Sequence, residues 1–278
     1  MTRKETKKLK LKFDLTFILK LITVILLIIA FSLVMVVIVR GKKVSTNSDI
    51  VNNLYSYMGS NDLLLCSGIP TYDSKKTTYD SIKNDVKICN AYTKVKEDNI
   101  TTIKIDKSKK ENICSIGKNV KFATDNYEDN ICTVTKISAD KIGDEYFKIY
   151  GKTIEQYETF DKDNKTICYF EDGFYYCGLS ETYTYTIGAE PHTFRSLKNA
   201  LKKKDNIIIY DYFVKVINNE CYTSFKGDVK NSKCSENYKS EEKTNYAFLK
   251  KYGTLYKHIF KLNESNDTYY WVSSEPVL

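Results

Sequence analysis

The sequence predicts an α+β protein, in which an N-terminal transmembrane helix precedes a strand-rich, disulfide-bonded extracytoplasmic domain with a few short helices. Three observations predict this class. Residues 21–39 carry no charge, all eight cysteines follow them, and short apolar segments then alternate with polar turns. The predicted parts are a basic cytoplasmic tail, a transmembrane helix, a linker, a strand-rich N-terminal lobe and an α+β C-terminal lobe, at residues 1–16, 17–40, 41–47, 48–137 and 138–278.

The apolar run has the length of a membrane helix. At about 1.5 Å per residue it spans roughly 28 Å, close to the hydrocarbon thickness of a bilayer. The alternative, a cleaved signal peptide, has an apolar region of about 7–15 residues and a site with small residues for cleavage. This run is longer and ends at Arg40 without such a site, which favours an uncleaved signal anchor. More cations precede it than follow it, so we expect a cytoplasmic N-terminus and a single pass through the plasma membrane.

The formal net charge of +8 belongs mainly to the N-terminal part. Residues 1–40 hold eight Lys or Arg against two Asp or Glu, whereas the rest holds 35 against 33. A domain so close to neutral has no overall field for nucleic acid, and we expect no nucleic-acid partner. The cluster at residues 202–204, three lysines, is interpreted as a solvated helix end.

The cysteines predict an oxidised, extracellular domain, because their number is even and none lies in the tail or the anchor. Cys168 and Cys177 flank a central Asp-Gly turn, and counting outward makes them a non-hydrogen-bonded pair with Cα atoms about 4.5 Å apart. The same count around a Gly-Asp dipeptide pairs Cys221 with Cys234. The remaining pairs follow by elimination: Cys66–Cys89 and Cys114–Cys132. With two histidines and no Cys-x-x-Cys motif, we expect neither a metal nor a cofactor.

The N-terminal lobe is predicted to be one helix followed by strands. Ser48 is a good N-cap, and apolar residues recur at helical spacing before Gly59: Ile50, Val51, Leu54 and Met58. Further along, apolar segments between polar turns predict strands at residues 88–95, 100–105, 120–123 and 132–137.

The C-terminal lobe is predicted to mix helices with longer strands. Residues 139–150 present an apolar helical face, and Gly151 suits the position after the helix; the face holds Ile142, Tyr146, Phe147 and Tyr150. Helical patterns recur at residues 194–203 and 245–252. Strand patterns occupy a hairpin at 166–178, then 182–187, 207–216 with a bend into a hairpin at Cys221, and a final hairpin of 255–262 with 268–273.

Several of these segments resemble a group of single-pass, membrane-anchored extracytoplasmic proteins from AT-rich Gram-positive bacteria. They are the helix around Leu54 and Tyr55, residues 146–152, the strand at 207–212, and 256–260 leading to 269–276. The resemblance implies the anchored architecture and no particular activity. The element order in residues 138–278 also resembles a nuclear-transport-factor-2-like cone, which implies a curved sheet around a pocket and serves enzymes and binding modules alike.

Four residues are candidates for ligand binding. Glu190, His192 and Arg195 lie where a turn enters a predicted helix, a place that can hold an anion. The alternative, which we favour, is an ordinary helix start with a surface histidine, because no base or nucleophile is fixed beside it. Asp211 is either a pocket carboxylate or a solvent-facing strand residue, and His258 is interpreted as a packed or surface histidine. No residue is assigned as catalytic.

The sequence therefore favours a non-enzymatic, membrane-anchored protein with a binding or structural role at the cell envelope. The expected partners are the lipid bilayer, for the N-terminal helix, and an envelope peptide, glycan or protein. An aromatic surface able to stack on sugars or peptides is one interpretation of the many tyrosines, and core packing is the other: Tyr175, Tyr176, Tyr183 and Tyr185. The alternative function is a hydrolase-like envelope enzyme that uses Glu190, His192 or Asp211 in a pocket of the C-terminal lobe.

Overall fold

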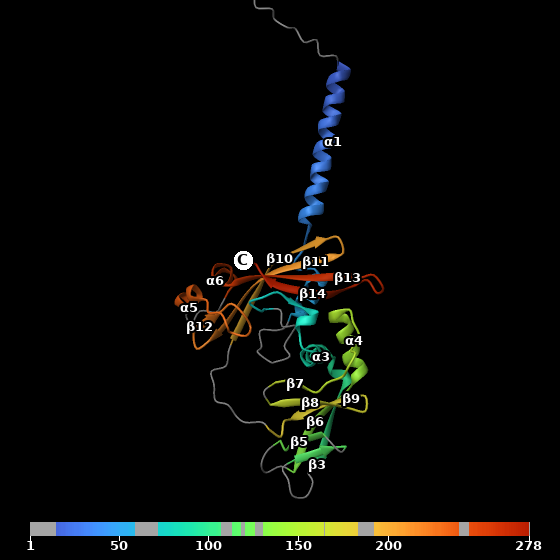
Figure 1. Ribbon diagram of the computed structural model, residues 1–278, viewed down its shortest axis with the longest axis vertical. Coiled ribbons are helices and arrows are strands. Elements are labelled where there is room, and N and C mark those ends of the chain that lie inside the picture. The colour runs from blue at the N-terminus through green and yellow to red at the C-terminus, as the bar shows by residue number, and fades with distance from the viewer. Residues whose placement is uncertain are drawn as a thin grey trace, which may run out of the picture. The chain divides into compact units, whose positions relative to one another are not determined.

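The computed structural model describes residues 15–58, 72–106, 113–117, 120–125, 130–163, 165–182, 192–238 and 245–277 (Figure 1). Contacts divide the chain into two units, Met1–Lys42 and Lys43–Leu278. The described residues confirm the α+β class, with strands more numerous than helices. Most of the strand predicted at 182–187, together with Glu190, Tyr183 and Tyr185, lies outside the described residues.

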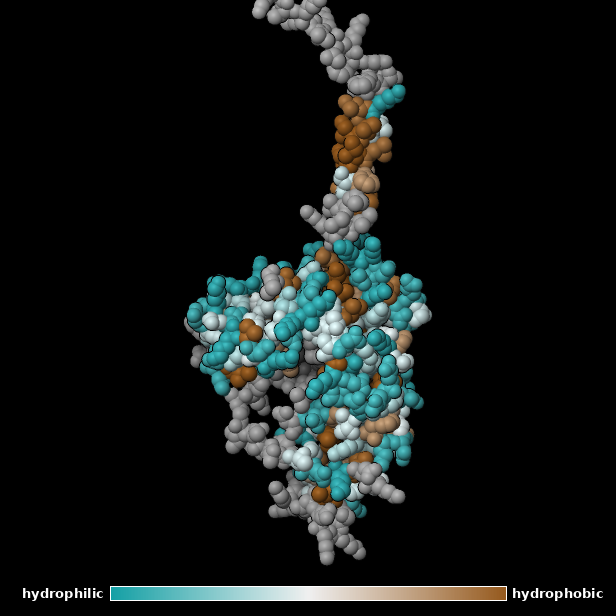
Figure 2. Space-filling model, viewed as in Figure 1, coloured by the Kyte–Doolittle hydropathy of each residue, from teal (hydrophilic) through white to brown (hydrophobic). Residues whose placement is uncertain are grey.

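The described part of the first unit contains one helix, α1 (Leu15–Arg40), of 26 residues, and residues 17–40 fall within it. Its side chains are described from residue 19 to residue 34, and they form a largely hydrophobic surface in Figure 2. Thr23 and Ser32 donate their hydroxyls to carbonyl oxygens four residues earlier, so neither adds an unsatisfied polar group. Among the residues that the structure describes, no helix combines the length and apolar character needed to cross a membrane.

The second unit contains a seven-stranded sheet. Six of its strands have the order β1-β10-β11-β13-β14-β2, and the seventh, β12, pairs with β11. The bounds are β1 (Lys42–Val44), β2 (Thr77–Thr78), β10 (His192–Lys203), β11 (Asn206–Ile217), β12 (Glu220–Tyr222), β13 (Thr254–Asn263) and β14 (Thr268–Pro276). Long antiparallel ladders join β10, β11, β13 and β14. This sheet carries the candidate site described below.

A five-stranded sheet and a two-stranded sheet complete the strands of the described residues. The former has the order β3 (Ile100–Asp106), β6 (Ile131–Ser138), β9 (Phe174–Leu179), β8 (Thr166–Glu171) and β7 (Phe160–Asp161); the latter pairs β4 (Ile113–Ile116) with β5 (Val120–Ala123). The strands predicted at residues 100–105, 120–123 and 132–137, the hairpin at 166–178 and the final hairpin are confirmed. The sequence patterns gave no sign of β1, β2, β4 or β7.

Helices cover both faces of the seven-stranded sheet. In Figure 1, α3 (Asn84–Tyr92) and α4 (Ala139–Tyr150) lie between this sheet and the five-stranded one. With α2 (Asp49–Tyr57), they share the largest hydrophobic core with both sheets. The opposite face of β11 packs Val214 and Val216 against α5 (Ser232–Asn237) and α6 (Tyr246–Tyr252). Two single 3₁₀ turns, at Tyr79–Ser81 and Glu97–Asn99, flank α3.

Ser48 caps α2 as predicted, and α6 lies within the predicted helical range 245–252. The Ser48 hydroxyl accepts a hydrogen bond from the Val51 amide at 3.4 Å, and the Asn245 side chain caps α6 at the Phe248 amide. Of the predicted apolar face of α2, Val51, Leu54 and Met58 are buried. Ile50 was placed on that face wrongly, because it turns outward and is 50% exposed.

Two predicted elements have the wrong type. Residues 88–95, predicted as a strand, belong largely to helix α3, because Ile88, Ala91 and Tyr92 lie on one helical face and are buried together. Residues 194–203, predicted as a helix, belong to β10, which pairs along its whole length with β11. Cross-strand hydrogen bonds therefore override the helical propensity of this lysine-rich segment. Its lysine cluster, residues 202–204, lies at a hairpin turn and not at a helix end.

The described residues form three of the predicted disulfides among themselves. Cys168 and Cys177 face each other across β8 and β9 in the predicted register, with Cα atoms 4.1 Å apart. Cys114–Cys132 joins β4 to β6. Cys89 is also disulfide-bonded, and its predicted partner, Cys66, lies outside the described residues.

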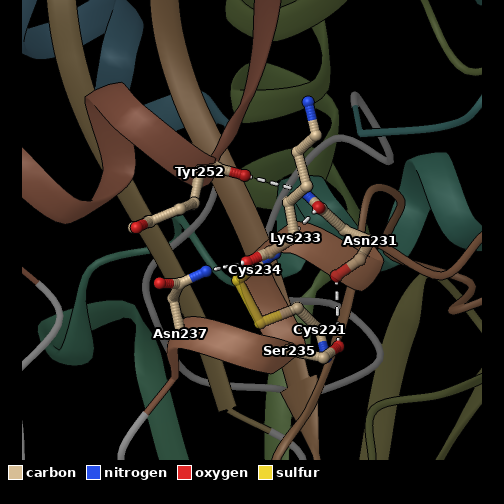
Figure 3. The surroundings of a disulfide bond; sticks show 7 residues. All are labelled: Cys221, Asn231, Lys233, Cys234, Ser235, Asn237 and Tyr252. Carbon is tan, nitrogen blue, oxygen red and sulfur yellow. Dashed lines mark hydrogen bonds between the residues drawn. A yellow bond between two sulfur atoms is a disulfide. The ribbon is translucent and has the colours of Figure 1, made fainter.

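The pair Cys221–Cys234 forms by a geometry different from the predicted hairpin. The ladder pairs Tyr222 with Lys230, and the chain then turns into α5, which carries Cys234 (Figure 3). Asn231 caps this helix by accepting from the Cys234 amide, and it donates to the Tyr252 carbonyl at 2.7 Å. A helical turn, and not a second strand, therefore brings the two sulfur atoms together.

Two glycines of α4 give a matched pair of substitutions. Gly151 ends the helix at φ +64°, and an added Cβ would lie 2.7 Å from the ring of Tyr270. We expect Gly151→Ala to lower the free energy of unfolding by about 1–3 kcal/mol, through left-handed strain and this overlap. Gly143 lies inside the helix, where a Cβ would meet only the Tyr157 hydroxyl, at 3.5 Å. Gly143→Ala should therefore raise the free energy of unfolding by up to about 1 kcal/mol.

Urea unfolding of the full-length protein in detergent micelles measures both changes. The fluorescence of Trp271, the one tryptophan of the chain, reports the transition, because its side chain is buried. A stabilising Gly151→Ala would contradict the helix end described here.

Candidate functional site

A hydrogen-bonded chain of polar side chains crosses three strands of the seven-stranded sheet. His258 Nε2 lies 2.8 Å from Asp211 Oδ1, and His258 Nδ1 lies 2.7 Å from Ser274 Oγ. The ladders bring these residues together, because His258 is opposite Ile209 on β11 and opposite Ser274 on β14. The side chains of Asp211 and His258 are 0% exposed.

Two more side chains complete what we call the buried polar network: Tyr72, Asp211, His258, Trp271 and Ser274. The Tyr72 hydroxyl donates to Asp211 Oδ2 at 2.6 Å, and Trp271 Nε1 donates to Ser274 Oγ at 2.9 Å. The donors and acceptors match when His258 carries a proton on Nε2, which donates to Asp211, and Nδ1 accepts from the Ser274 hydroxyl. Every member has a hydrogen-bonding partner, as buried polar groups require.

A β-bulge between β13 and β14 aims two of these side chains at the same face. Ile259 is opposite Ser273, whereas Phe260 is opposite Trp271, so Val272 has no opposite residue. In a regular strand, residues three positions apart point to opposite faces. The extra residue removes that alternation locally, which lets Trp271 and Ser274 meet.

Aromatic rings surround the network. Phe213 stacks on Tyr72 with centroids 4.2 Å apart, and Tyr256 packs edge-on against Tyr72 at 5.1 Å. Burial raises the pKa of Tyr72, and the nearby Asp211 carboxylate raises it further. Tyr72 therefore stays a neutral hydrogen-bond donor to the carboxylate.

Arg195 and Tyr55 lie beside the network. Arg195 is opposite Phe213 in the ladder, so it shares the face of Asp211. Its guanidinium lies over the Tyr55 ring, 4.3 Å from the centroid, and donates to the Tyr55 carbonyl at 3.4 Å. Burial raises the pKa of Tyr55, the charge of Asp211 raises it further, and Arg195 acts in the opposite direction. The cation and the buried carboxylate thus influence the same phenol.

Of the three ligand candidates that the structure describes, two share this region. Arg195 and Asp211 lie on the same face of the sheet, whereas His192 is opposite Val216 and points to the other face, where it is exposed. Since β10 is a strand, His192 and Arg195 do not converge as they would on one helical turn. Glu190 lies outside the described residues.

The sequence reasoning missed Ser274 and the interaction of His258 with Asp211. The alternation of Tyr256, His258 and Phe260 was a usable signal, because it places the histidine on the apolar face of its strand. Ser274 had no such signal. Counting back from the final turn pairs His258 with Ser273, and only the bulge moves Ser274 into place.

Two cavities lie away from the network. The acidic cavity, of about 540 Å³, is lined by Asp140, Gly143, Asp144, Phe147, Lys148, Thr153, Ile154, Tyr157 and Asn266. The lysine cavity, of about 530 Å³, is lined by Asp73, Ser74, Lys75, Lys76, Thr77, Ser81, Ile82, Lys83, Val86, Lys226 and Asp228. Within the described ranges, no three His, Cys, Asp or Glu side chains are grouped to hold a metal ion.

Fold and site together define an α+β, disulfide-bonded domain with a polar network inside its largest sheet, preceded in the chain by helix α1. Comparisons of the chain with family models, curated proteins and solved structures find no match.

Proposed function

We propose that the protein is a non-enzymatic, single-pass membrane protein whose disulfide-bonded domain lies outside the plasma membrane and has a binding or structural role at the cell envelope. The disulfides carry this proposal, because such bonds persist in oxidising compartments. All three described pairs lie in the second unit, with sulfur-bearing side chains at most 3% exposed. The uncharged run at residues 21–39 supports the anchor.

The buried polar network supports a structural role for the most catalytic-looking residues of the domain. A nucleophile must reach its substrate, yet Ser274 is 0% exposed and its Oγ is already bound by His258 and Trp271. The network instead links β11, β13 and β14 to the segment at Tyr72.

Protease treatment of intact Gram-positive cells that express the full chain tests the topology. A C-terminal epitope should be lost and an N-terminal epitope retained, and alkylation without reduction should modify none of the eight cysteines. Protection of the C-terminal epitope, or alkylation of all cysteines in native protein, would refute the proposal. Retention of the full chain by cell-wall or membrane fractions then tests the binding role.

Hydrolysis at Ser274 is a second candidate function, favoured by one observation. The series Asp211, His258, Ser274 has the order of an orienting carboxylate, a base and a nucleophile. Incubation of the full-length protein with a fluorophosphonate probe, followed by peptide mapping, separates the two functions. The non-enzymatic proposal expects no label on Ser274, as on the exposed control Ser265. Stoichiometric labelling of Ser274 would replace the first proposal with the second.

A further inference from the structure

We infer that the lysine cavity is a binding site for a small anion of the phosphate-ester type. The inference rests on the proposed binding role and names its ligand class. The cavity is formed by residues 73–86, which include β2 and the start of α3, and by the turn at residues 226–228. Its volume of about 530 Å³ falls in the range of about 300–1,000 Å³ typical of small-molecule sites.

The two carboxylates of the cavity wall are already occupied. Asp73 accepts from Lys226 Nζ at 2.7 Å and from the Lys75 amide, while Asp228 accepts from the hydroxyls of Ser74 and Ser224. Partial burial acts to raise the pKa of Asp73, but the hydrogen bond from Lys226 lowers it overall. The Ser224 hydroxyl likewise lowers the pKa of Asp228. Both carboxylates are therefore ionised and held in place by partners within the wall.

Three lysines remain at the cavity without an ion-pair partner in the described part of the chain: Lys75, Lys76 and Lys83. The nearby carboxylate of Glu275 is bound by Lys257 Nζ at 2.6 Å. That hydrogen bond lowers the pKa of Glu275, and the charge of Lys76 contributes in the same direction. Lys76 therefore lies near a carboxylate that already has Lys257 as its ion-pair partner.

The concave wall of the lysine cavity carries a net positive charge. With Lys226 paired to Asp73, the three free lysines outweigh the one remaining acid, Asp228. A concave surface with one dominant sign concentrates its electrostatic potential and attracts ions of the opposite sign. Charge-assisted hydrogen bonds from ammonium groups to phosphate oxygens are stronger than neutral ones. Ile82 and Val86 also line the cavity, and their apolar side chains could contact a small organic part of the ester.

Calorimetric titration of the full-length protein in zwitterionic micelles, at constant ionic strength, tests the site. The probes are inorganic pyrophosphate, glycerol phosphate and dihexanoyl phosphatidylglycerol below its micelle concentration. We expect the triple variant K75Q/K76Q/K83Q to bind each responding probe about tenfold or more weakly than the wild type. Response to glycerol phosphate identifies a free ester as the ligand, and response to the lipid alone identifies a headgroup.

The lysine cluster at the β10–β11 turn provides a matched control. The variant K202Q/K203Q/K204Q removes the same charge from exposed positions outside the cavity, and its affinity should stay within about twofold of the wild type. Equal weakening of both variants, or no response to any probe, overturns the inference. The protease and alkylation results would stand in either case, so failure of this site is distinguishable from failure of the proposed topology.

Discussion

Asp211→Ala is expected to lower the free energy of unfolding by about 2–6 kcal/mol, because two buried donors each lose their acceptor at a cost of about 1–3 kcal/mol. The Tyr72 hydroxyl and His258 Nε2 would both lose their partner in a region that excludes water. Urea unfolding of the full-length protein in micelles, followed by Trp271 fluorescence, measures the change. Trp271 is a suitable reporter because it belongs to the same network.

Two variants control this measurement. Asp211→Asn keeps the shape and one acceptor atom, so we expect a smaller loss, of about 1–3 kcal/mol. Asp144→Ala replaces an exposed aspartate on α4 and should change stability by no more than about 0.5 kcal/mol. If Asp211→Ala behaved like Asp144→Ala, the network would not stabilise the sheet.

Removal of the Cys114–Cys132 disulfide by alanine substitution of both residues should destabilise the β4–β5 hairpin by about 3 kcal/mol. The two cysteines belong to a small core with only three other buried members, Val120, Phe122 and Val134. A two-stranded sheet is marginal without further support. Hydrogen exchange at the amides of residues 113–116 and 120–123 should therefore accelerate about 100-fold.

Trp271 fluorescence provides the contrast for this second substitution. Because the hairpin core is separate from the core that holds Trp271, the urea midpoint reported by fluorescence should fall much less than local protection does. A fall of about 3 kcal/mol in both readouts would contradict local unfolding and would make the hairpin part of one cooperative unit.

Elements with local signals could be predicted from the sequence. The Asp-Gly dipeptide set the register of β8 and β9, including the Cys168–Cys177 pair, because hairpin pairing follows from its turn. Helix α4 has the predicted bounds, since its apolar period and its terminal glycine agree. The type of β10 could not be obtained locally, because its hydrogen bonds go to β11 and its own residues favour a helix.

Only part of the candidate site could be predicted from the sequence. Alternation along β11 placed Asp211 on the face of Ile209 and Phe213 but left open whether it is buried, and the structure buries it. Its partners depend on the alignment of separate strands. The bulge at Val272 shifts that alignment by one residue, and no pattern in the sequence of β14 predicts this bulge.

The separation of partners along the chain has a consequence for folding during synthesis. The described disulfides join residues 9, 13 and 18 positions apart, so each can close soon after its own segment emerges. Tyr72 and Asp211 are 139 positions apart, and Ser274 is supplied by β14. In a chain that emerges N-terminus first, β11 and β13 therefore lack part of their hydrogen-bonding network until β14 has emerged. Such non-local closure is slow and exposes strand edges, which makes chaperones relevant to its assembly.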